Sequence, residues 1–142
     1  AVNTQIDNTD IFISVAAVAD YYCLNPSEQK IKKDAHILTL EFGPNPDILA
    51  NVTSLDTPPF CVGFAAESEN LLEFAEQKRR RKQLPLLAAN LVTEALGSDH
   101  NEITLLDDQG RHPLPRGTKL EVARKLIGHV ASLYPGWIAQ RY

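Results

Sequence analysis

The chain carries an unbroken apolar run at Phe60-Cys61-Val62-Gly63-Phe64-Ala65-Ala66. A strand that is buried on both faces of a parallel sheet has this pattern, because neither set of alternating side chains meets water. Runs of the same kind stand before and after it, at residues 11–17 and 84–89. Residues 36–42 alternate more loosely and predict a further strand, whereas residues 21–29 are predicted to form a loop. Most of the predicted strands are therefore central strands of a sheet.

Helical segments separate these strands. Asn45-Pro46-Asp47 predicts a helix start, with Asn45 as the N-cap and Pro46 at the first helical position. Ser68 is the candidate N-cap of the next helix, which we expect to run to about Gln83. Each helix thus follows one predicted strand and precedes another.

The last part of the chain predicts a hairpin and a third helix. Residues 102–106 and 111–114 are expected to pair across a turn at residues 107–110. The helix begins with the capping box Thr118-Lys119-Leu120-Glu121 and is expected to end at Pro135-Gly136. Its predicted core-facing stripe consists of Ala123, Leu126, Ile127, Val130 and Leu133.

Alternating strands and helices predict one α/β domain over residues 1–142. We expect a three-layer, Rossmann-like architecture: an open, mostly parallel sheet with helices on both faces, together with a small β-hairpin and a flap. Residues 135–142 are expected to form a tail. Polar residues directly precede a central-type strand at the start of the chain, so we expect the first strand–helix unit of such a domain to be missing.

Composition excludes several classes of protein. A formal net charge of −4 argues against broad nucleic-acid binding, and 44% hydrophobic and 23% charged residues are typical of a globular domain. No signal peptide or membrane span is visible, so we expect a cytoplasmic protein without membrane partners. Cys23 and Cys61 form no disulfide framework, and we interpret both as structural.

Ligands of open parallel sheets bind beyond the carboxyl ends of the strands. Three such ends are predicted here, at residues 16–20, at residues 64–67 and at Asn90. Small side chains gather at the first two, which suits either a ligand close to the backbone or tight packing of helices on the sheet. Asp20 can bind a sugar hydroxyl or a metal ion, or it can cap a loop. The sequence alone leaves these alternatives open.

Two sets of lysines are further candidates. Lys30, Lys32 and Lys33 form either a cationic flap that follows phosphates or a solvated edge strand. The run Lys78-Arg79-Arg80-Arg81-Lys82 ends a predicted helix. Helical spacing places Lys78 and Lys82 on the core-facing stripe with Leu71, Phe74 and Ala75, and it predicts that Arg79 and Arg80 are solvated. Lysines on such a stripe need an anion or a route to water.

The spacing of the histidines along the sequence indicates no metal site. His36, His100, His112 and His129 are scattered along the chain, and none of the usual pairings for zinc occurs. No phosphate-binding glycine motif and no hydrolase motif is present either. Metal ligands therefore remain unassigned from the sequence.

In their order, these segments resemble the phosphopantothenoylcysteine synthetases, a domain that usually forms the carboxyl-terminal part of a bacterial bifunctional coenzyme A biosynthesis protein. The matching segments are residues 16–20, 30–33, 45–48 and 63–67, the helix with Lys78 and Lys82, and residues 88–90. Together they extend from about Asp10 to Tyr134. The resemblance implies a dimeric ligase that joins 4′-phosphopantothenate to L-cysteine. It also implies CTP and Mg²⁺, with an acyl-cytidylate as the intermediate.

The resemblance further implies roles for individual residues. Lys30 is the implied catalytic residue and would stabilise charge on the acyl-cytidylate. The implied nucleotide-binding residues are Ser14, Val15, Ala16, Asp20, Pro46, Asp47, Ile48, Leu49, Phe64, Lys78 and Lys82. Such a reaction mainly requires orientation of the reactants and neutralisation of phosphate charge.

Two differences from the family pattern, and the expected position of Lys82, bear on this interpretation. The family's glycine-rich first unit and its phosphopantothenate-binding Asn segment have no counterpart here, and Leu91 stands where the family commonly has Asp. Lys82 is expected about 20 Å from the start of its helix, so a bend or a partner subunit would have to bring it to the nucleotide. Two functions stay open: a portion of a CTP-dependent ligase, or a module that binds a cytidine nucleotide or a dimer partner without turnover. A third interpretation, a domain with a purely structural role, would require the order of these motifs to be a coincidence.

Overall fold

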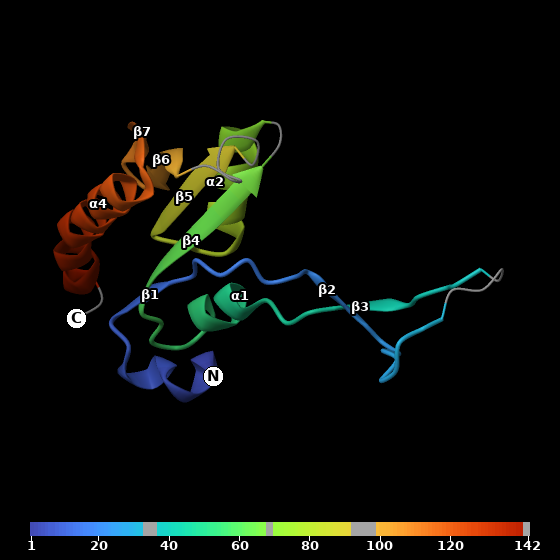
Figure 1. The fold of residues 1–142 in the computed structure, drawn as a ribbon. Helices are drawn as coiled ribbons and strands as arrows, with labels where there is room; N and C mark the ends of the chain where they lie inside the picture. The colour runs from blue at the N-terminus through green and yellow to red at the C-terminus, as the bar shows by residue number, and fades with distance from the viewer. Residues whose placement is uncertain (33–36, 68–69, 92–98, 141–142) are drawn as a thin grey trace.

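The computed structural model describes residues 1–32, 37–67, 70–91 and 99–140. A five-stranded sheet with the order β1-β4-β5-β6-β7 forms the body (Figure 1). Its strands are β1 (Ile11–Ile13), β4 (Phe60–Glu67), β5 (Leu86–Leu91), β6 (His100–Asp107) and β7 (Gly110–Thr118). The first three are mutually parallel, whereas β6 and β7 are added antiparallel. The predicted α/β sheet and its hairpin are thus confirmed.

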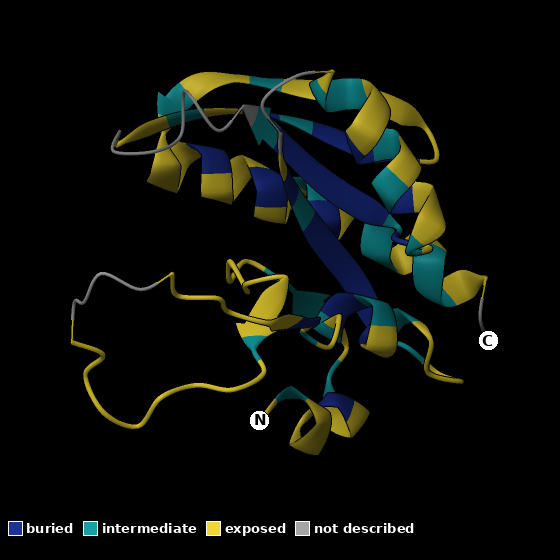
Figure 2. Ribbon diagram, turned by 90° about the vertical axis from the view of Figure 1, so that its right-hand side faces the viewer, coloured by how far each residue is buried: buried dark blue, intermediate teal, exposed yellow. Residues whose placement is uncertain are grey.

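Helices cover both faces of the sheet (Figures 1 and 2). On one face, α1 (Ile48–Thr53), α2 (Leu71–Arg81) and the short 3-10 helix η2 (Ile6–Asn8) share a core with Cys61 and Ala65 of β4. On the other face, α4 (Lys119–Ala139) shares a core with Phe60 and Val62 of the same strand. Successive side chains of a strand point to opposite faces, so β4 serves both cores. This arrangement confirms the predicted three layers. A second 3-10 helix, η1 (Val2–Thr4), precedes η2.

Gly63 allows Leu49 of α1 and Leu84, just before β5, to approach the middle of β4 closely. A Cβ atom at this position would lie 2.7 Å from Leu84 Cδ1 and 3.0 Å from Leu49 Cδ2. We therefore expect Gly63→Ala to lower the free energy of unfolding by about 1–3 kcal/mol, because two packed leucines would have to move. Urea denaturation would measure the change.

Gly128 provides the matched control for this substitution. It is exposed in α4, and a Cβ there would meet nothing within 4 Å. Gly128→Ala should therefore leave the protein equally stable or stabilise it by up to about 1 kcal/mol. A Gly63→Ala variant as stable as the parent would show that the close approach of the two leucines is not limiting.

The strands before α1 differ from the prediction. β1 has only three residues and lies at the edge of the sheet, where Ile11 is 37% exposed. β2 (Tyr21–Cys23), in the predicted loop, pairs antiparallel with β3 (Phe42–Pro44), so residues 37–41 do not belong to the strand that was expected over residues 36–42. His36 lies outside the described residues. Gly43 is buried beneath Tyr22 and Leu24, which explains why a glycine stands within a strand.

The beginnings of two helices also differ from the prediction. Asp47, not Asn45, is the N-cap of α1, and its Oδ1 accepts a hydrogen bond from the Ala50 N–H at 3.0 Å. Asn70 is the N-cap of α2, in a left-handed conformation with φ 47°. Ser68 lies outside the described residues.

Helix α4 has the predicted capping box but continues past its predicted end. Thr118 and Glu121 bond reciprocally, as expected. The helix then runs through Pro135 to Ala139, so residues 135–139 are not a tail. The missing Pro135 N–H leaves only the exposed Ala131 carbonyl without its bond, and the continuation packs Trp137 on Phe60, with ring centroids 5.5 Å apart. Its buried stripe is Val122, Leu126 and Val130, so the prediction of Ala123 and Ile127, both exposed, was wrong.

Candidate functional site

A cleft of ≈ 530 Å³ lies beside the parallel half of the sheet. Its walls come from the loop after β1, the start of α1, the carboxyl-terminal halves of β4 and β5, and one face of α2. All the residues that the resemblance implied for nucleotide binding line this cleft, namely Ser14, Val15, Ala16, Asp20, Pro46, Asp47, Ile48, Leu49, Phe64, Lys78 and Lys82. Asn90 also lines it, so the three predicted strand ends meet at one place.

Hydrogen bonds fix the two chain segments that form the outer wall. The Ser14 N–H donates to the Val62 carbonyl at 2.9 Å, which anchors the first residue after β1. Asn45 donates from its backbone to the Asp20 carbonyl and from its side chain to the Ala19 carbonyl, both at 2.8 Å. Asn45, expected to cap a helix, thus joins the start and the end of the segment that carries β2 and β3.

Lys78 forms part of the inner wall. Its ammonium donates to the Phe64 carbonyl at 3.0 Å, near the end of β4. The side chain is half-buried, as expected for a lysine on the inward face of α2. Its positive charge is therefore held at the rim of the sheet, where it faces the cleft.

Lys82 contacts Asp47 across the cleft. Lys82 Nζ lies 2.6 Å from Asp47 Oδ2, and only 13% of the Lys82 side chain is exposed. Partial burial alone would raise the pKa of Asp47, but the hydrogen bonds from Lys82 and the Ala50 N–H outweigh it and hold that pKa below its ordinary value. Asp47 therefore stays ionised at neutral pH while it caps α1 and pairs with Lys82.

Lys82 reaches the cleft within one chain, so neither a bend nor a partner subunit is needed to bring it there. The expectation of a bend or a partner subunit assumed that the ligand would lie wholly beyond the strand ends. In the structure, α1 packs over the middle of β4 through Leu49 and Gly63. Its N-terminus then meets the carboxyl-terminal end of α2, and the cleft extends along the sheet to both lysines.

The chemistry of the cleft suits an anion with an apolar part. Lys78 and Lys82 supply positive charge at one wall, and phosphates are bound by such point charges. Ala16, Ala17 and Ala19 are exposed on the other wall, so a ligand can approach the backbone closely. Val15 is 65% exposed and Phe64 is half-buried, which leaves apolar surface for a flat ring.

Another hollow of ≈ 750 Å³ suits an anion less well. It lies between η2, the segment before β4 and the end of α4. Among the residues that the structure describes, its lining includes Asp7, Asp10 and Asp56 and no lysine or arginine. Like charges would repel a phosphate there, so we assign the candidate site to the lysine cleft.

Lys30 does not line the cleft. It is exposed, as is Lys32, on the segment between β2 and β3, and Lys33 lies outside the described residues. In Figures 1 and 2 this segment projects from the body as a largely exposed arm. The structure thus brings together the predicted nucleotide contacts but not the predicted catalytic lysine.

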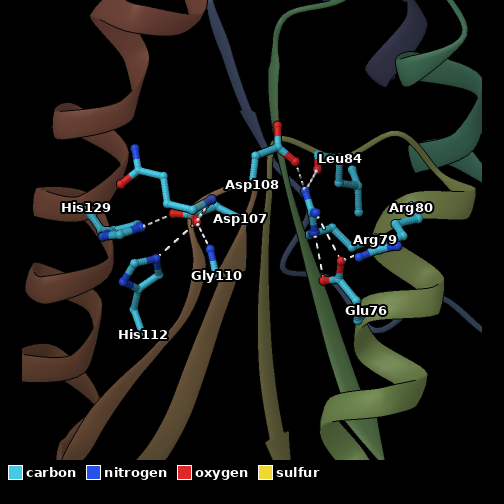
Figure 3. Close-up of polar contacts among 10 residues, drawn as sticks. Glu76, Arg79, Arg80, Leu84, Asp107, Asp108, Gly110, His112 and His129 are labelled. Atoms are coloured by element: carbon cyan, nitrogen blue, oxygen red, sulfur yellow. Dashed lines mark hydrogen bonds and ion pairs between the residues drawn. The ribbon is translucent and has the colours of Figure 1, made fainter.

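Arg79 corrects the prediction for the cationic run. It was expected to be solvated, but its side chain is only 8% exposed. The guanidinium donates to Glu76, to Asp108 and to the Leu84 carbonyl, which ties α2 to the chain before β5 and to the β6–β7 turn (Figure 3). Arg80 is exposed as predicted, whereas Phe74, expected to face inward, is 45% exposed. Helical periodicity did not predict the burial of Arg79, because it does not show that polar groups of other chain segments cover this face of α2.

The spacing of the histidines along the sequence also gave no sign of a cluster of two imidazoles and a carboxylate on the opposite side of the sheet. His112 Nε2 lies 3.0 Å from Asp107 Oδ1, and His129 Nε2 lies 2.8 Å from Asp107 Oδ2 (Figure 3). Burial alone would raise the pKa of Asp107, but the hydrogen bonds from both histidines outweigh it and lower that pKa. Only the hairpin and α4 together bring the two histidines to one carboxylate.

The fold and the cleft define an open-sheet α/β protein with a lysine-containing cleft at the ends of its parallel strands. The chain matches the DNA/pantothenate metabolism flavoprotein C-terminal domain family over residues 1–134 and belongs to that family. It is 41% identical over 141 residues to the Coenzyme A biosynthesis bifunctional protein CoaBC of Escherichia coli (strain K12), a match that covers 94% of this chain and 35% of that protein. Identity to the CoaBC protein of Bacillus subtilis (strain 168) is 34% over 137 residues, covering 94% of this chain and 34% of that protein. The chain thus spans about a third of the length of these relatives.

Solved structures agree with this assignment. The crystal structure of the C-terminal domain of a CoaBC protein superposes with a TM-score of 0.73 at 28% identity, covering 95% of this chain and 60% of that one. A mutant of Cab2 in complex with phosphopantothenate-cysteine gives a TM-score of 0.69 at 19% identity, covering 92% and 46%, and shows a shared fold. The predicted family and fold are therefore confirmed. In the described part of the chain, no helix is both long enough and apolar enough to cross a membrane.

Proposed function

We propose that the chain carries the nucleotide-binding part of a phosphopantothenate–cysteine ligase, a cytoplasmic, homodimeric enzyme of coenzyme A biosynthesis. In the proposed reaction, the carboxylate of 4′-phosphopantothenate attacks the α-phosphate of CTP and releases pyrophosphate. The amine of L-cysteine then attacks the acyl-cytidylate, loses a proton and displaces CMP to leave an amide.

One observation carries this proposal. The residues that the family resemblance implies as nucleotide contacts come from four separate segments of the chain, yet all of them line one cleft with two lysines. Structural packing alone would not require a half-buried lysine and an exposed valine to face the same space. The curated relatives are named as coenzyme A biosynthesis proteins, which supports a role in coenzyme A biosynthesis.

Each wall of the cleft has a part in the proposal. Lys78 and Lys82 would bind the phosphates, and their charge would offset the charge that develops on the α-phosphate. Ser14, Val15, Ala16 and Phe64 would contact the nucleoside, and Pro46 to Leu49 would close the pocket. Lys30 would act on the acyl-cytidylate, which requires the arm to take another position when the substrates bind.

Mg²⁺ belongs to the proposal as a companion of the nucleotide. In such sites it is usually held by one or two carboxylates together with substrate phosphates. Among the described residues, Asp20 and Asp47 are the carboxylates that line the cleft, and Lys82 already contacts Asp47. The exposed Asp20 therefore fits this role better, and the bound ion would neutralise part of the phosphate charge.

A module that binds nucleotide without turnover is the second candidate, because the chain spans only about a third of its curated relatives. Calorimetry with CTP and an assay of pyrophosphate release in the presence of phosphopantothenate and cysteine separate the two. Saturable binding with release supports a self-sufficient ligase. Saturable binding without release supports the binding module, and absence of CTP binding would refute the proposed site.

The role of Lys30 can be tested in the corresponding full-length enzyme. We expect Lys30→Gln to lower turnover about 100-fold, because removal of one group that stabilises a developing charge typically costs this much. CTP affinity should stay within about twofold, since Lys30 does not line the cleft. Lys32→Gln, on the same exposed segment, is the control and should retain activity. Turnover of Lys30→Gln equal to that of the parent would exclude the role of Lys30.

A further inference from the structure

Three metal-binding side chains converge where the β6–β7 hairpin meets α4. Asp107 is the last residue of β6, His112 lies in β7 and His129 lies in α4. One ligand atom from each lies within 4.8 Å of the other two, and the imidazole centroids are 4.7 Å apart (Figure 3). Among the described residues, this is the group whose geometry could hold a metal ion.

The carboxylate of this cluster is fixed in place. Asp107 is 3% exposed, and its Oδ1 accepts hydrogen bonds from the Gln109 N–H at 2.8 Å and the Gly110 N–H at 3.0 Å. The other oxygen, Oδ2, lies 2.8 Å from His129 Nε2. A fixed carboxylate with one oxygen directed at an imidazole is a ready ligand, because binding a metal requires little reordering of the protein.

The two histidines can complete a metal site with little movement. Ligand atoms around a tetrahedral zinc ion stand about 3.3 Å apart, as metal–ligand bonds of about 2.0–2.1 Å require. His112 Nε2 lies 3.0 Å from Asp107 Oδ1 and His129 Nε2 lies 2.8 Å from Asp107 Oδ2, both close to this value, and one ligand atom from each residue lies within 4.8 Å of the others. The His112 and His129 side chains are 34% and 20% exposed, so solvent can supply a fourth ligand.

We propose that Asp107, His112 and His129 form a zinc site that links helix α4 to the β6–β7 hairpin. Two imidazoles with one carboxylate suit zinc and its neighbours in the first transition row, whereas magnesium prefers oxygen ligands alone. The site lies on the α4 side of the sheet, away from the residues of the lysine cleft, and none of its members lines that cleft. Its role is structural: one ion joins α4 to the paired strands β6 and β7, a link to which His129 and Asp107 otherwise contribute a hydrogen bond.

The test uses the chain without a histidine tag, freed of metal by a chelator and dialysed. Zinc titration by calorimetry should give one site per chain with a Kd of about 1 μM or tighter, and zinc should raise the melting temperature. Cobalt should give the strong visible absorption of a tetrahedral site. Loss of a partner that only orients a ligand already costs about 10–100-fold in affinity, so His112→Ala and His129→Ala should each weaken zinc binding at least tenfold.

His100→Ala is the matched control, because His100 lies in β6 outside the cluster. It should bind zinc as the parent does. The cobalt spectrum of the parent needs no variant, so the test stands even if a substitution impairs folding. Absence of zinc binding and of the cobalt bands would overturn the proposal and leave a hydrogen-bonded link only. Equal zinc affinity in the parent and both cluster variants would overturn it too.

Discussion

Replacing Arg79 with methionine is expected to lower the free energy of unfolding by about 2–4 kcal/mol. Methionine fills much of the same space but donates no hydrogen bond, so the Leu84 carbonyl loses the Arg79 guanidinium, which lies 3.2 Å away. Glu76 loses the stronger of its two cationic partners. Hydrogen bonds from Arg79 and then Arg80 lower the pKa of Glu76 from 4.5 to about 2, which shows how strongly its ionised form is held.

Arg80→Met isolates the effect of burial. Arg80 has the same charge, follows Arg79 directly and also bonds Glu76 at 2.7 Å, but its side chain is 75% exposed. Exposed ion pairs contribute little, so this variant should change stability by no more than about 1 kcal/mol. Urea denaturation at pH 7 measures both variants. Equal losses for the two would show that the buried contacts of Arg79 carry no special weight.

Replacing Lys82 with glutamine is expected to weaken CTP binding about tenfold or more. A hydrogen bond to a charged group contributes about 1.5–3 kcal/mol, and Lys82 must first give up part of its contact with Asp47. Calorimetry on the chain measures the affinity, with thermal unfolding to verify that the variant is folded.

Two further variants sharpen this test. Arg81→Gln removes the same charge from the same end of α2 at an exposed position outside the cleft, and it should leave CTP affinity within about threefold. Asp47→Asn keeps a capping side chain for α1 but removes the competing charge, so it should bind CTP at least as tightly as the parent. An unchanged affinity in Lys82→Gln would remove this lysine from the proposed site.

Much of the parallel half of the fold was predictable, because local patterns report burial. The apolar runs that became β4 and β5 lie in the middle of the sheet, and residues of both are fully buried. The capping box at Thr118 identified the start of α4 without any tertiary information. The cleft residues could be chosen only through the family resemblance, since an alanine or a proline at a loop carries no chemical signature of its own.

Features that depend on distant contacts were not predictable. Arg79 is buried because Asp108 and the Leu84 carbonyl lie over it, 29 and five residues away along the chain. His112 and His129 meet at Asp107 because a hairpin and a helix cross there. α4 continues through Pro135 because packing of Trp137 offsets one lost hydrogen bond. In each case a tertiary contact overrides the local preference of the sequence.

The pairing of Lys82 with Asp47 also affects how strongly the cleft attracts an anion that is still some distance away. At separations much larger than 2.6 Å, the two opposite charges cancel, so this pair adds little to the electric field around the cleft. Long-range attraction of anions to the cleft is therefore weak in a chain whose formal net charge is −4. An arriving polyphosphate gains the charge of Lys82 only on contact, when it takes the place of Asp47. The cleft thus selects its ligand after the encounter and does little to speed the encounter itself.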